Sequence, residues 1–190
     1  MDPSHIMQVG MGFWASKTLL SAVELELFSV LACGPLNAQG LAEALKLHPR
    51  AVPDFPDTLV ALRLLNREGT GPTAAYSNTP EAALFLDKKS PAYVGGILEM
   101  ANARLFRFWA DLTPALRSGS PQNETKNGGE SLFAKLYEDP AQLEQFMNAM
   151  SGVSAGNCQI LAQQFDFSKY KTWAPIVAAT DYQPALAVDA

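Results

Sequence analysis

Side chains that could carry catalysis are scarce in this chain. It contains two histidines, His5 and His48, and two cysteines, Cys33 and Cys158. None has the spacing of a metal-binding Cys/His cluster. Neither a Gly-x-Ser-x-Gly elbow nor a phosphate-binding Gly-Lys-Ser/Thr loop occurs. The sequence therefore predicts no metal site, and we expect structural or solvent-exposed roles for both histidines.

The residues that could form a binding site are apolar and aromatic. Flat rings and adaptable methionine side chains suit a pocket for a flat organic substrate. The same spacing also fits an ordinary helix core, so both interpretations stay open. The seven candidates for lining a substrate pocket are Phe13, Trp14, Phe108, Trp109, Phe146, Met147 and Met150.

Length and composition favour one globular domain with a partner. The chain has 190 residues, of which 48% are hydrophobic and only 17% charged. Such a low charge content suggests that some surface is buried against another subunit, although a helix-rich core would also explain it. The net charge of -5 argues against non-specific nucleic-acid binding, which needs a basic face.

The start of the chain gives no sign of export. Residues 1–5 are polar and acidic, which is unlike a secretory signal. No apolar stretch reaches the roughly 20 residues of a membrane span. With two cysteines expected to be free thiols, the sequence predicts a cytoplasmic protein without a membrane partner.

Helical periodicity dominates, so we predict a mainly α fold. A first helix from Ser4 is apolar on more than one face, which favours packing into a second subunit. Further helices are predicted at 21–32, 38–45, 50–66, 91–116, 131–137 and 139–165, with another opening at Thr79-Pro80-Glu81 and a polar loop at 118–130.

A winged helix-turn-helix is predicted over about residues 21–80. Three helices are followed there by a turn at 67–73 and an extended segment at 74–78, which together indicate a small β-hairpin wing. Winged helices bind DNA in some proteins and serve as packing modules in others. A DNA-binding regulator is therefore the alternative function, although the cations of the candidate recognition helix are matched by acids. These residues are Arg50, Arg63 and Arg67 against Asp54, Asp57 and Glu68.

Several stretches resemble bacterial O-methyltransferases related to plant caffeate-type and acetylserotonin-type enzymes. They are HIMQVGMGFWASKTLLSAVEL at 5–25, SLFAKLY at 131–137 and FMNAMS at 146–151. The segment FDFSKYKT at 165–172 is similar to the family's approach to its cofactor domain. The resemblance covers about residues 4–172 and keeps the family's order.

The resemblance implies a division of the chain into two parts. Residues 1–172 would be a dimerisation and substrate-side domain, with N-terminal helices interlocked in a homodimer and a small aromatic hydroxyl compound as substrate. Residues 173–190 would be an altered start of the Rossmann-like domain that binds S-adenosylmethionine. In the family, glycines of that domain let the backbone approach the cofactor at the head of a helix.

The segment at the expected cofactor motif departs from the family pattern. An acidic residue, an apolar residue and Gly-Gly-x-x-Gly are expected, but Pro175 stands at the acid and Val177, Ala178 and Asp181 stand at the glycines. No histidine lies in this part of the chain, where the family's catalytic base would follow. We therefore expect a catalytically incomplete chain, without catalytic or cofactor-binding residues of its own.

Two versions of this interpretation stay open. In one, the chain is a truncated methyltransferase; in the other, it is a stand-alone partner that pairs with a full-length homologue and lowers its activity. The sequence identifies neither the version nor the substrate.

Overall fold

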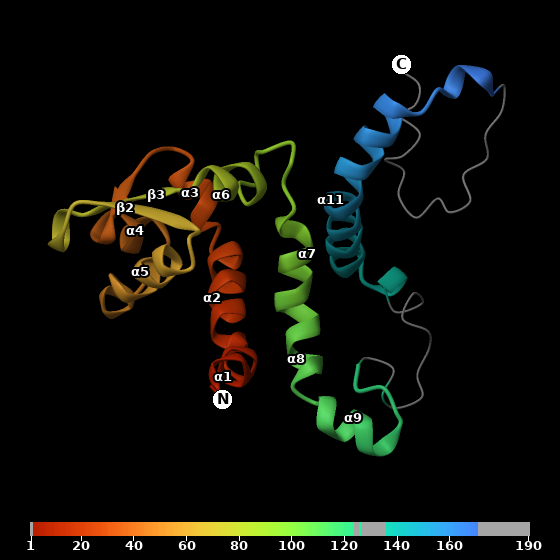
Figure 1. Cartoon of the computed structure of the whole chain (residues 1–190), viewed down its shortest axis with the longest axis horizontal. Helices are drawn as coiled ribbons and strands as arrows, with labels where there is room; N and C mark the ends of the chain where they lie inside the picture. The colour runs from red at the N-terminus through yellow and green to blue at the C-terminus, as the bar shows by residue number, and fades with distance from the viewer. Residues whose placement is uncertain (1, 124–125, 127–135, 171–190) are drawn as a thin grey trace.

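The computed structural model describes residues 2–123, 126 and 136–170 (Figure 1). Helices dominate, and one small antiparallel sheet accompanies them. The sheet and the helices around it form one side of Figure 1, whereas the helices α7, α8 and α11 stand on the other side of α2. The expectation of a mainly α fold with a small β-hairpin is confirmed.

The N-terminal helices are divided differently from the prediction. α1 spans Ser4–Gly10 and α2 spans Gly12–Glu24, so α2 runs through the expected helix start at residue 21. Glu26 has a left-handed conformation with φ of 55°, which ends α2 and separates it from α3 at Leu27–Leu31. A left-handed residue closes a helix because its backbone cannot continue the right-handed turn.

The two central helices begin where their caps place them. In α4, Ala38–Ala44, the Asn37 side chain accepts a hydrogen bond of 2.8 Å from the backbone N–H of Gly40. α5 spans only Asp54–Ala61, because Pro49–Ala51 forms a separate 3-10 turn, η1. Pro56 is accommodated because the first N–H groups of a helix need no intrahelical partner. The predicted helix over 50–66 is therefore wrong at both ends.

The sheet makes the wing. β1 is Leu36–Asn37, β2 is Leu65–Glu68 and β3 is Ala75–Asn78, in the spatial order β1-β3-β2. β2 and β3 pair antiparallel from Leu65 opposite Asn78 to Glu68 opposite Ala75, and a 3-10 turn at Gly71–Thr73, η2, lies between them. The winged helix-turn-helix architecture is confirmed.

One closed core holds this module together. Its buried side chains come from α2, α3, α4, α5, both long strands and α6, which spans Pro80–Phe85. The cluster consists of Ala22, Val23, Leu27, Phe28, Leu31, Leu41, Leu45, Leu59, Leu65, Tyr76 and Ala82. Burial of such side chains is the main favourable contribution to folding.

The expected long helix over 91–116 is a broken one. It begins as α7 at Gly95–Met100, passes through a π-helical segment, η3, at Ala101–Leu105, and continues as α8 at Phe106–Trp109. Two residues later it resumes as α9 at Leu112–Ser118. π-helical segments inside α-helices are often found at functional sites.

The predicted long helix over 139–165 is confirmed as α11. It spans Pro140–Gln164, and the Asp139 carboxylate caps it by accepting hydrogen bonds from the N–H groups of Ala141 and Gln142. A short 3-10 turn, η4, follows at Phe167–Lys169.

α7 and α11 pack closely through glycine (Figure 1). A Cβ atom at Gly96 would lie 3.1 Å from the Asn148 carbonyl oxygen, and one at Gly152 would lie 3.1 Å from the Tyr93 carbonyl oxygen. Since both obstacles are backbone atoms, larger residues would separate the two helices.

Some predicted features lie outside the described residues. They are residues 124–125 and 127–130 of the 118–130 loop, the first five residues of the 131–137 helix, and the whole of 173–190 with its altered cofactor motif. Among the residues that are described, no helix is long and apolar enough to cross a membrane.

Candidate interaction surface, substrate wall and polar cleft

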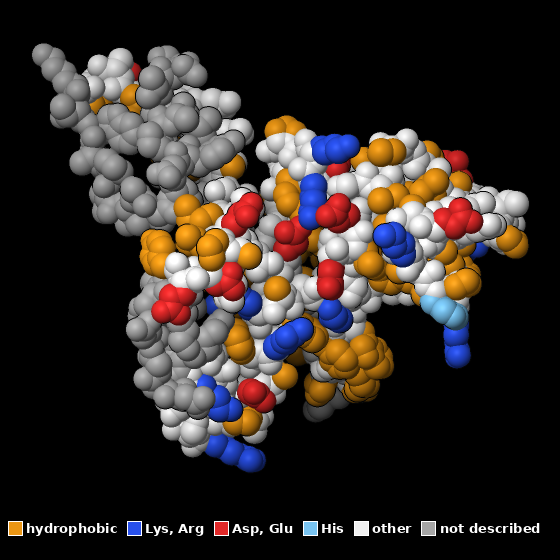
Figure 2. All heavy atoms as spheres, turned by 180° about the vertical axis from the view of Figure 1, so that it is seen from behind, with side chains coloured by type: hydrophobic (Ala, Val, Ile, Leu, Met, Phe, Trp, Pro, Cys, Tyr) orange, Lys and Arg blue, Asp and Glu red, His pale blue; other side chains and the backbone are white. Residues whose placement is uncertain are grey.

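The N-terminal helices carry a large exposed apolar surface. α1 has no buried residue, and Ile6, Val9 and Trp14 are 73%, 68% and 63% exposed. Figure 2 shows hydrophobic side chains gathered over this end of the molecule. Contiguous exposed apolar patches of this kind mark protein–protein interaction sites, so α1 and the start of α2 have the chemistry of an interface.

Two of the predicted pocket residues belong to this surface. Phe13 and Trp14 lie at the start of α2, both more than half exposed, with their ring centroids 5.4 Å apart. In this chain they contribute to the exposed face of the N-terminal helices rather than to an enclosed cavity.

The other five candidates lie on the two facing helices. Phe108 and Trp109 end α8, where Phe108 is half-buried and Trp109 is 72% exposed. Phe146, Met147 and Met150 lie on α11 and are half-buried. None of the seven lines either of the two clefts described below. Their role in binding substrate stays a prediction.

A polar cleft of about 570 Å³ lies between α2, α7, η3 and α11. Figure 2 shows acidic and basic side chains mixed in the middle of the face that it presents. Sequence reasoning missed this cleft because its residues come from four distant segments and none has a distinctive motif. It is lined by Lys17, Glu24, Lys88, Glu99, Asn102, Ala103, Phe106, Arg107 and Gln145.

One side of the cleft is organised around Asn102 of the π-helical segment. Its amide oxygen accepts a hydrogen bond from the Lys17 ammonium group, and its amide nitrogen donates one of 2.6 Å to Glu24. The Lys17 ammonium also lies 5.8 Å from the centre of the Phe106 ring and 3.9 Å from the Glu24 carboxylate. These contacts join α2 to η3 and place an aromatic face beside hydrogen-bonding groups.

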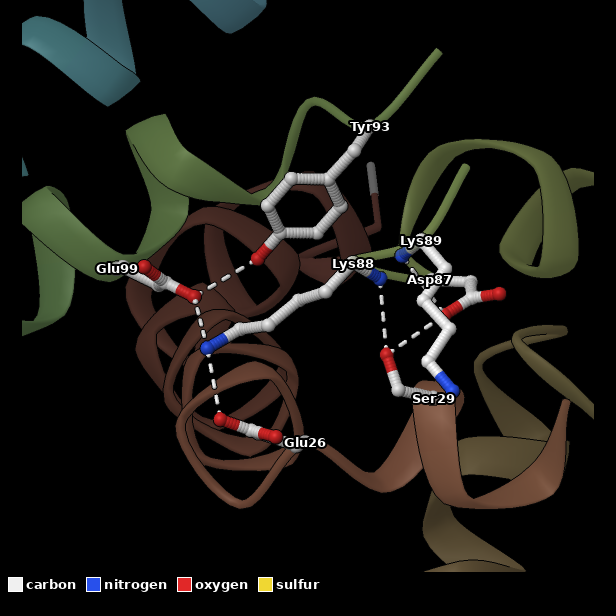
Figure 3. A network of polar contacts seen from close by, with 7 residues as sticks. All are labelled: Glu26, Ser29, Asp87, Lys88, Lys89, Tyr93 and Glu99. Atoms are coloured by element: carbon white, nitrogen blue, oxygen red, sulfur yellow. Dashed lines mark hydrogen bonds and ion pairs between the residues drawn. The ribbon is translucent and has the colours of Figure 1, made fainter. Parts of the chain in front are cut away.

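The other side is organised around Lys88, as Figure 3 shows. Its ammonium group lies 2.8 Å from a Glu26 oxygen and 3.0 Å from a Glu99 oxygen. The Tyr93 hydroxyl donates a 2.8 Å hydrogen bond to the same Glu99 oxygen. Glu26 belongs to the turn after α2 and Glu99 to α7, so this network joins the winged helix to the long helices.

A backbone contact anchors Lys88 within this network. Its N–H donates a 2.8 Å hydrogen bond to the Ser29 hydroxyl, which in turn donates one of 2.8 Å to Asp87. Asp87 also accepts from the N–H of Lys89 (Figure 3). The turn that carries Lys88 is thereby fixed to α3.

The electrostatic environment favours the protonated forms of Tyr93 and Lys88. Burial raises the pKa of the Tyr93 hydroxyl, and the hydrogen bond to Glu99 and the charges of Glu99 and Glu26 raise it further. Burial alone would lower the pKa of Lys88, but its bonds to Glu26 and Glu99 outweigh burial and raise it above the ordinary 10.5. Both groups therefore hold their protons at neutral pH.

No group of histidine, cysteine, aspartate or glutamate residues in the described parts of the chain could hold a metal ion. His48 accepts a hydrogen bond of 3.2 Å from the Arg50 N–H and caps η1. Cys33 is exposed, Cys158 is half-exposed, and neither forms a disulfide.

A family model agrees with the exposed N-terminal helices and the winged helix that follows them. The model described as the O-methyltransferase dimerisation domain matches residues 7–88. This chain carries an O-methyltransferase dimerisation domain. The matched segment runs from within α1 through the winged helix to the Lys88 turn, and thus includes the winged-helix core and the apolar surface except for Ile6.

Curated relatives extend the similarity over most of the chain. The tetracenomycin polyketide synthesis 8-O-methyl transferase of Streptomyces glaucescens is 41% identical over 177 residues, which are 93% of this chain and 50% of the relative. An N,N-dimethyltransferase of Streptomyces rimosus is 34% identical over 175 residues, or 92% of this chain and 49% of the relative. The chain thus spans about half the length of these relatives.

A solved structure confirms the fold. Human N-acetylserotonin methyltransferase, determined in complex with SAM, superposes with a TM-score of 0.78 at 29% identity, covering 88% of this chain and 50% of that protein. The relatives named here are methyltransferases, and none is a DNA-binding regulator. Arg67, a cation of the alternative DNA-binding interpretation, is paired at 3.1 Å with Asp57.

Proposed function

We propose that this chain forms the dimerisation and substrate-side half of an S-adenosylmethionine-dependent O-methyltransferase assembly. The observation that carries the proposal is the coincidence of the matched dimerisation domain, residues 7–88, with the exposed apolar surface of α1 and α2. Ile6, Val9 and Trp14 on that surface would be buried by the N-terminal helices of a second copy. Each large apolar side chain buried in this way contributes about 1.5–3 kcal/mol.

The dimer is tested by light scattering at micromolar concentration. We expect about twice the chain mass of 20.5 kDa. Trp14→Asp should give the monomer mass, because a charge would be buried without a partner. The matched control is Ile160→Asp, which places the same charge on an exposed apolar position of α11 and should leave the dimer intact. A monomer mass for the unchanged chain would refute the homodimer.

The substrate wall is assigned to α8 and α11. In this proposal the substrate is a small aromatic hydroxyl compound. Phe108 and Trp109 on α8 would contact it from one side. The other side would be formed on α11 by Phe146, Met147 and Met150. Phe13 and Trp14 of a second copy would complete this wall if the N-terminal helices interlock. The support is the aromatic and methionine character of these positions, together with the names of the aligned relatives.

A chimeric enzyme tests this assignment. Residues 1–172 of this chain would replace the matching half of the 41%-identical polyketide methyltransferase. Met150→Ala in that chimera should raise KM about tenfold with little change in kcat, because the wall binds ground and transition states alike. Gln164→Ala, on the exposed end of α11, is the control. If the chimera is active and Met150→Ala leaves its KM unchanged, the assignment is contradicted.

The chain itself is expected to bind no S-adenosylmethionine. This follows from Pro175, Val177, Ala178 and Asp181 at the motif positions where the family has its acid and glycines. A side chain at such positions blocks close approach of the backbone to the cofactor. Calorimetric titration of the 190-residue protein should give no heat of binding, and micromolar affinity would overturn the expectation. The homodimer measurement above is independent of this outcome.

A further inference from the structure

A second cleft lies on the winged helix, among residues that the methyltransferase assignment does not use. Its walls are the outer side of α4, the turn around η1, and the wing tip at η2. Its apolar lining includes Ala42, Leu47, Val52, Pro53 and Pro72. α4 contacts both η1 and η2, so the three walls belong to one packed unit.

The size and rigidity of this cleft suit a small molecule. Its volume is about 780 Å³, within the usual range of about 300–1,000 Å³ for small-molecule sites. Prolines at positions 49, 53 and 72 restrict the backbone of two walls. A preformed apolar cleft loses little conformational entropy when a ligand enters.

The charged groups around the cleft favour an anion. Lys46 and Arg67 line it together with one acid, Glu43. Glu43 already accepts a 2.9 Å hydrogen bond from Gln39, and Arg67 is held by Asp57 at 3.1 Å. The Lys46 ammonium group has no hydrogen-bond or ion-pair partner among the described residues.

The backbone at Lys46 closes α4. Lys46 adopts a left-handed conformation with φ of 53° two residues after the helix, and the Leu47 N–H donates a 2.8 Å hydrogen bond back to the Ala42 carbonyl oxygen. This is a common way for a helix to end. Here it places an unpaired ammonium group at the edge of an apolar cleft.

We propose that this cleft binds a small organic acid with a flat apolar body, such as an aromatic carboxylate. The apolar body would cover Leu47 and Val52, and the carboxylate would pair with Lys46. A strongly hydrated inorganic anion would gain nothing from the apolar lining, and a neutral apolar molecule would leave Lys46 unused.

The probe for this site is 1-naphthoate. Its binding is measured as chemical-shift changes in the amide NMR spectrum of the isotopically labelled 190-residue protein. A ligand with about 13 non-hydrogen atoms should bind with a Kd of about 1 mM. The shifted amides should cluster at residues 39–47 and 71–74. Shifts that cluster on α1 and α2 instead, or no saturation by about 10 mM, would overturn the proposal.

Matched variants distinguish binding at this site from non-specific binding elsewhere on the protein. Ala42→Trp fills the cleft and should abolish binding, whereas Ala44→Trp, on the exposed face of the same helix, should not. Lys46→Gln should weaken 1-naphthoate about fivefold and leave the neutral 1-naphthamide unchanged. Equal binding of both compounds to the unchanged protein would refute the anionic specificity. A change of oligomeric mass in Ala42→Trp would instead make the cleft a subunit contact and overturn the proposal.

Discussion

The winged helix and the long helices that follow it differ in how much of their apolar surface is buried. Among the buried hydrophobic residues described, only Met100, Leu136 and Ala149 lie outside residues 20–82. In α8 and α9, Trp109 is 72% exposed and Leu116 is 76% exposed, while Phe106 and Phe108 are half-buried. The winged helix therefore has a closed apolar core, whereas the helices that follow leave part of their apolar surface exposed.

The largest effect expected from this comparison concerns identical substitutions in the two regions. Leu59→Ala removes a fully buried side chain of α5 and should lower the free energy of unfolding by about 2–5 kcal/mol. Leu116→Ala on α9 should change it by no more than about 0.5 kcal/mol. Urea unfolding followed by circular dichroism measures both. Similar losses for the two variants would show that α9 is packed as tightly as the winged helix.

The junction of α7 and α11 gives the next effect. Gly96→Val should destabilise this pair by about 1–3 kcal/mol, because its side chain would press on the backbone at Asn148 and Ala149. Gly156→Val is the control, since nothing lies within 4 Å of a Cβ there.

Hydrogen exchange distinguishes the two regions in this experiment. Amides of α11 should lose protection in Gly96→Val, while amides of α3 and α5 keep theirs. If α3 and α5 lose protection equally, the winged helix and the long helices unfold as one unit, and the comparison between them fails.

Local signals in the sequence predicted the winged helix well. Asn37 and Thr79 have the side chains of helix caps, and both caps are formed. The turn before β3 was expected from its glycines and proline. Such features depend on a few neighbouring residues, so a pattern read along the chain can find them.

Features that depend on distant contacts were not predictable. The break at Glu26 is not marked by glycine or proline, and its side chain pairs with Lys88, 62 positions away. The π-helical segment is similarly unmarked, and its Asn102 bonds to α2. The polar cleft consists of such long-range pairs, which explains why sequence analysis found the aromatic residues but missed the cleft.

Alkaline pH should weaken the winged helix by a smaller amount. Burial, then the hydrogen bond to Asp57 and the charge of Asp57, raise the pKa of Tyr76 from 10.0 to about 12. Because the folded-state pKa is the higher one, this stabilisation is complete below pH 10. It disappears as the pH rises to about 12, at a cost of about 2 kcal/mol.

Urea unfolding at pH 9 and pH 11.5 tests this dependence. Tyr76→Phe should reduce the loss of stability between the two pH values, and Tyr93, whose pKa is also raised, should account for part of what remains. Tyr137→Phe is the control, since this side chain is 73% exposed. An unchanged pH dependence in Tyr76→Phe would show that ionisation of the Tyr76 hydroxyl does not contribute to the loss of stability at high pH.

The smallest effect concerns the link between the two regions at Lys88. Lys88→Met removes the ion pairs to Glu26 and Glu99, and we expect a loss of only about 1 kcal/mol because the Lys88 side chain is 38% exposed. Lys89→Met is the control on the neighbouring residue. A double-mutant cycle with Glu26→Gln should give a coupling energy of about 0.5 kcal/mol.

A structural consequence makes this link more important than its energy. Lys88 lies where the matched dimerisation domain ends, and its partners belong to the turn after α2 and to α7. Loss of the link should therefore raise the exchange rate of α7 amides without changing those of α5. Unaltered exchange in α7 would mean that the close packing of α7 on α11 and its contacts with α2 alone hold the helix in place, and that the two regions are joined by apolar contacts rather than by charge.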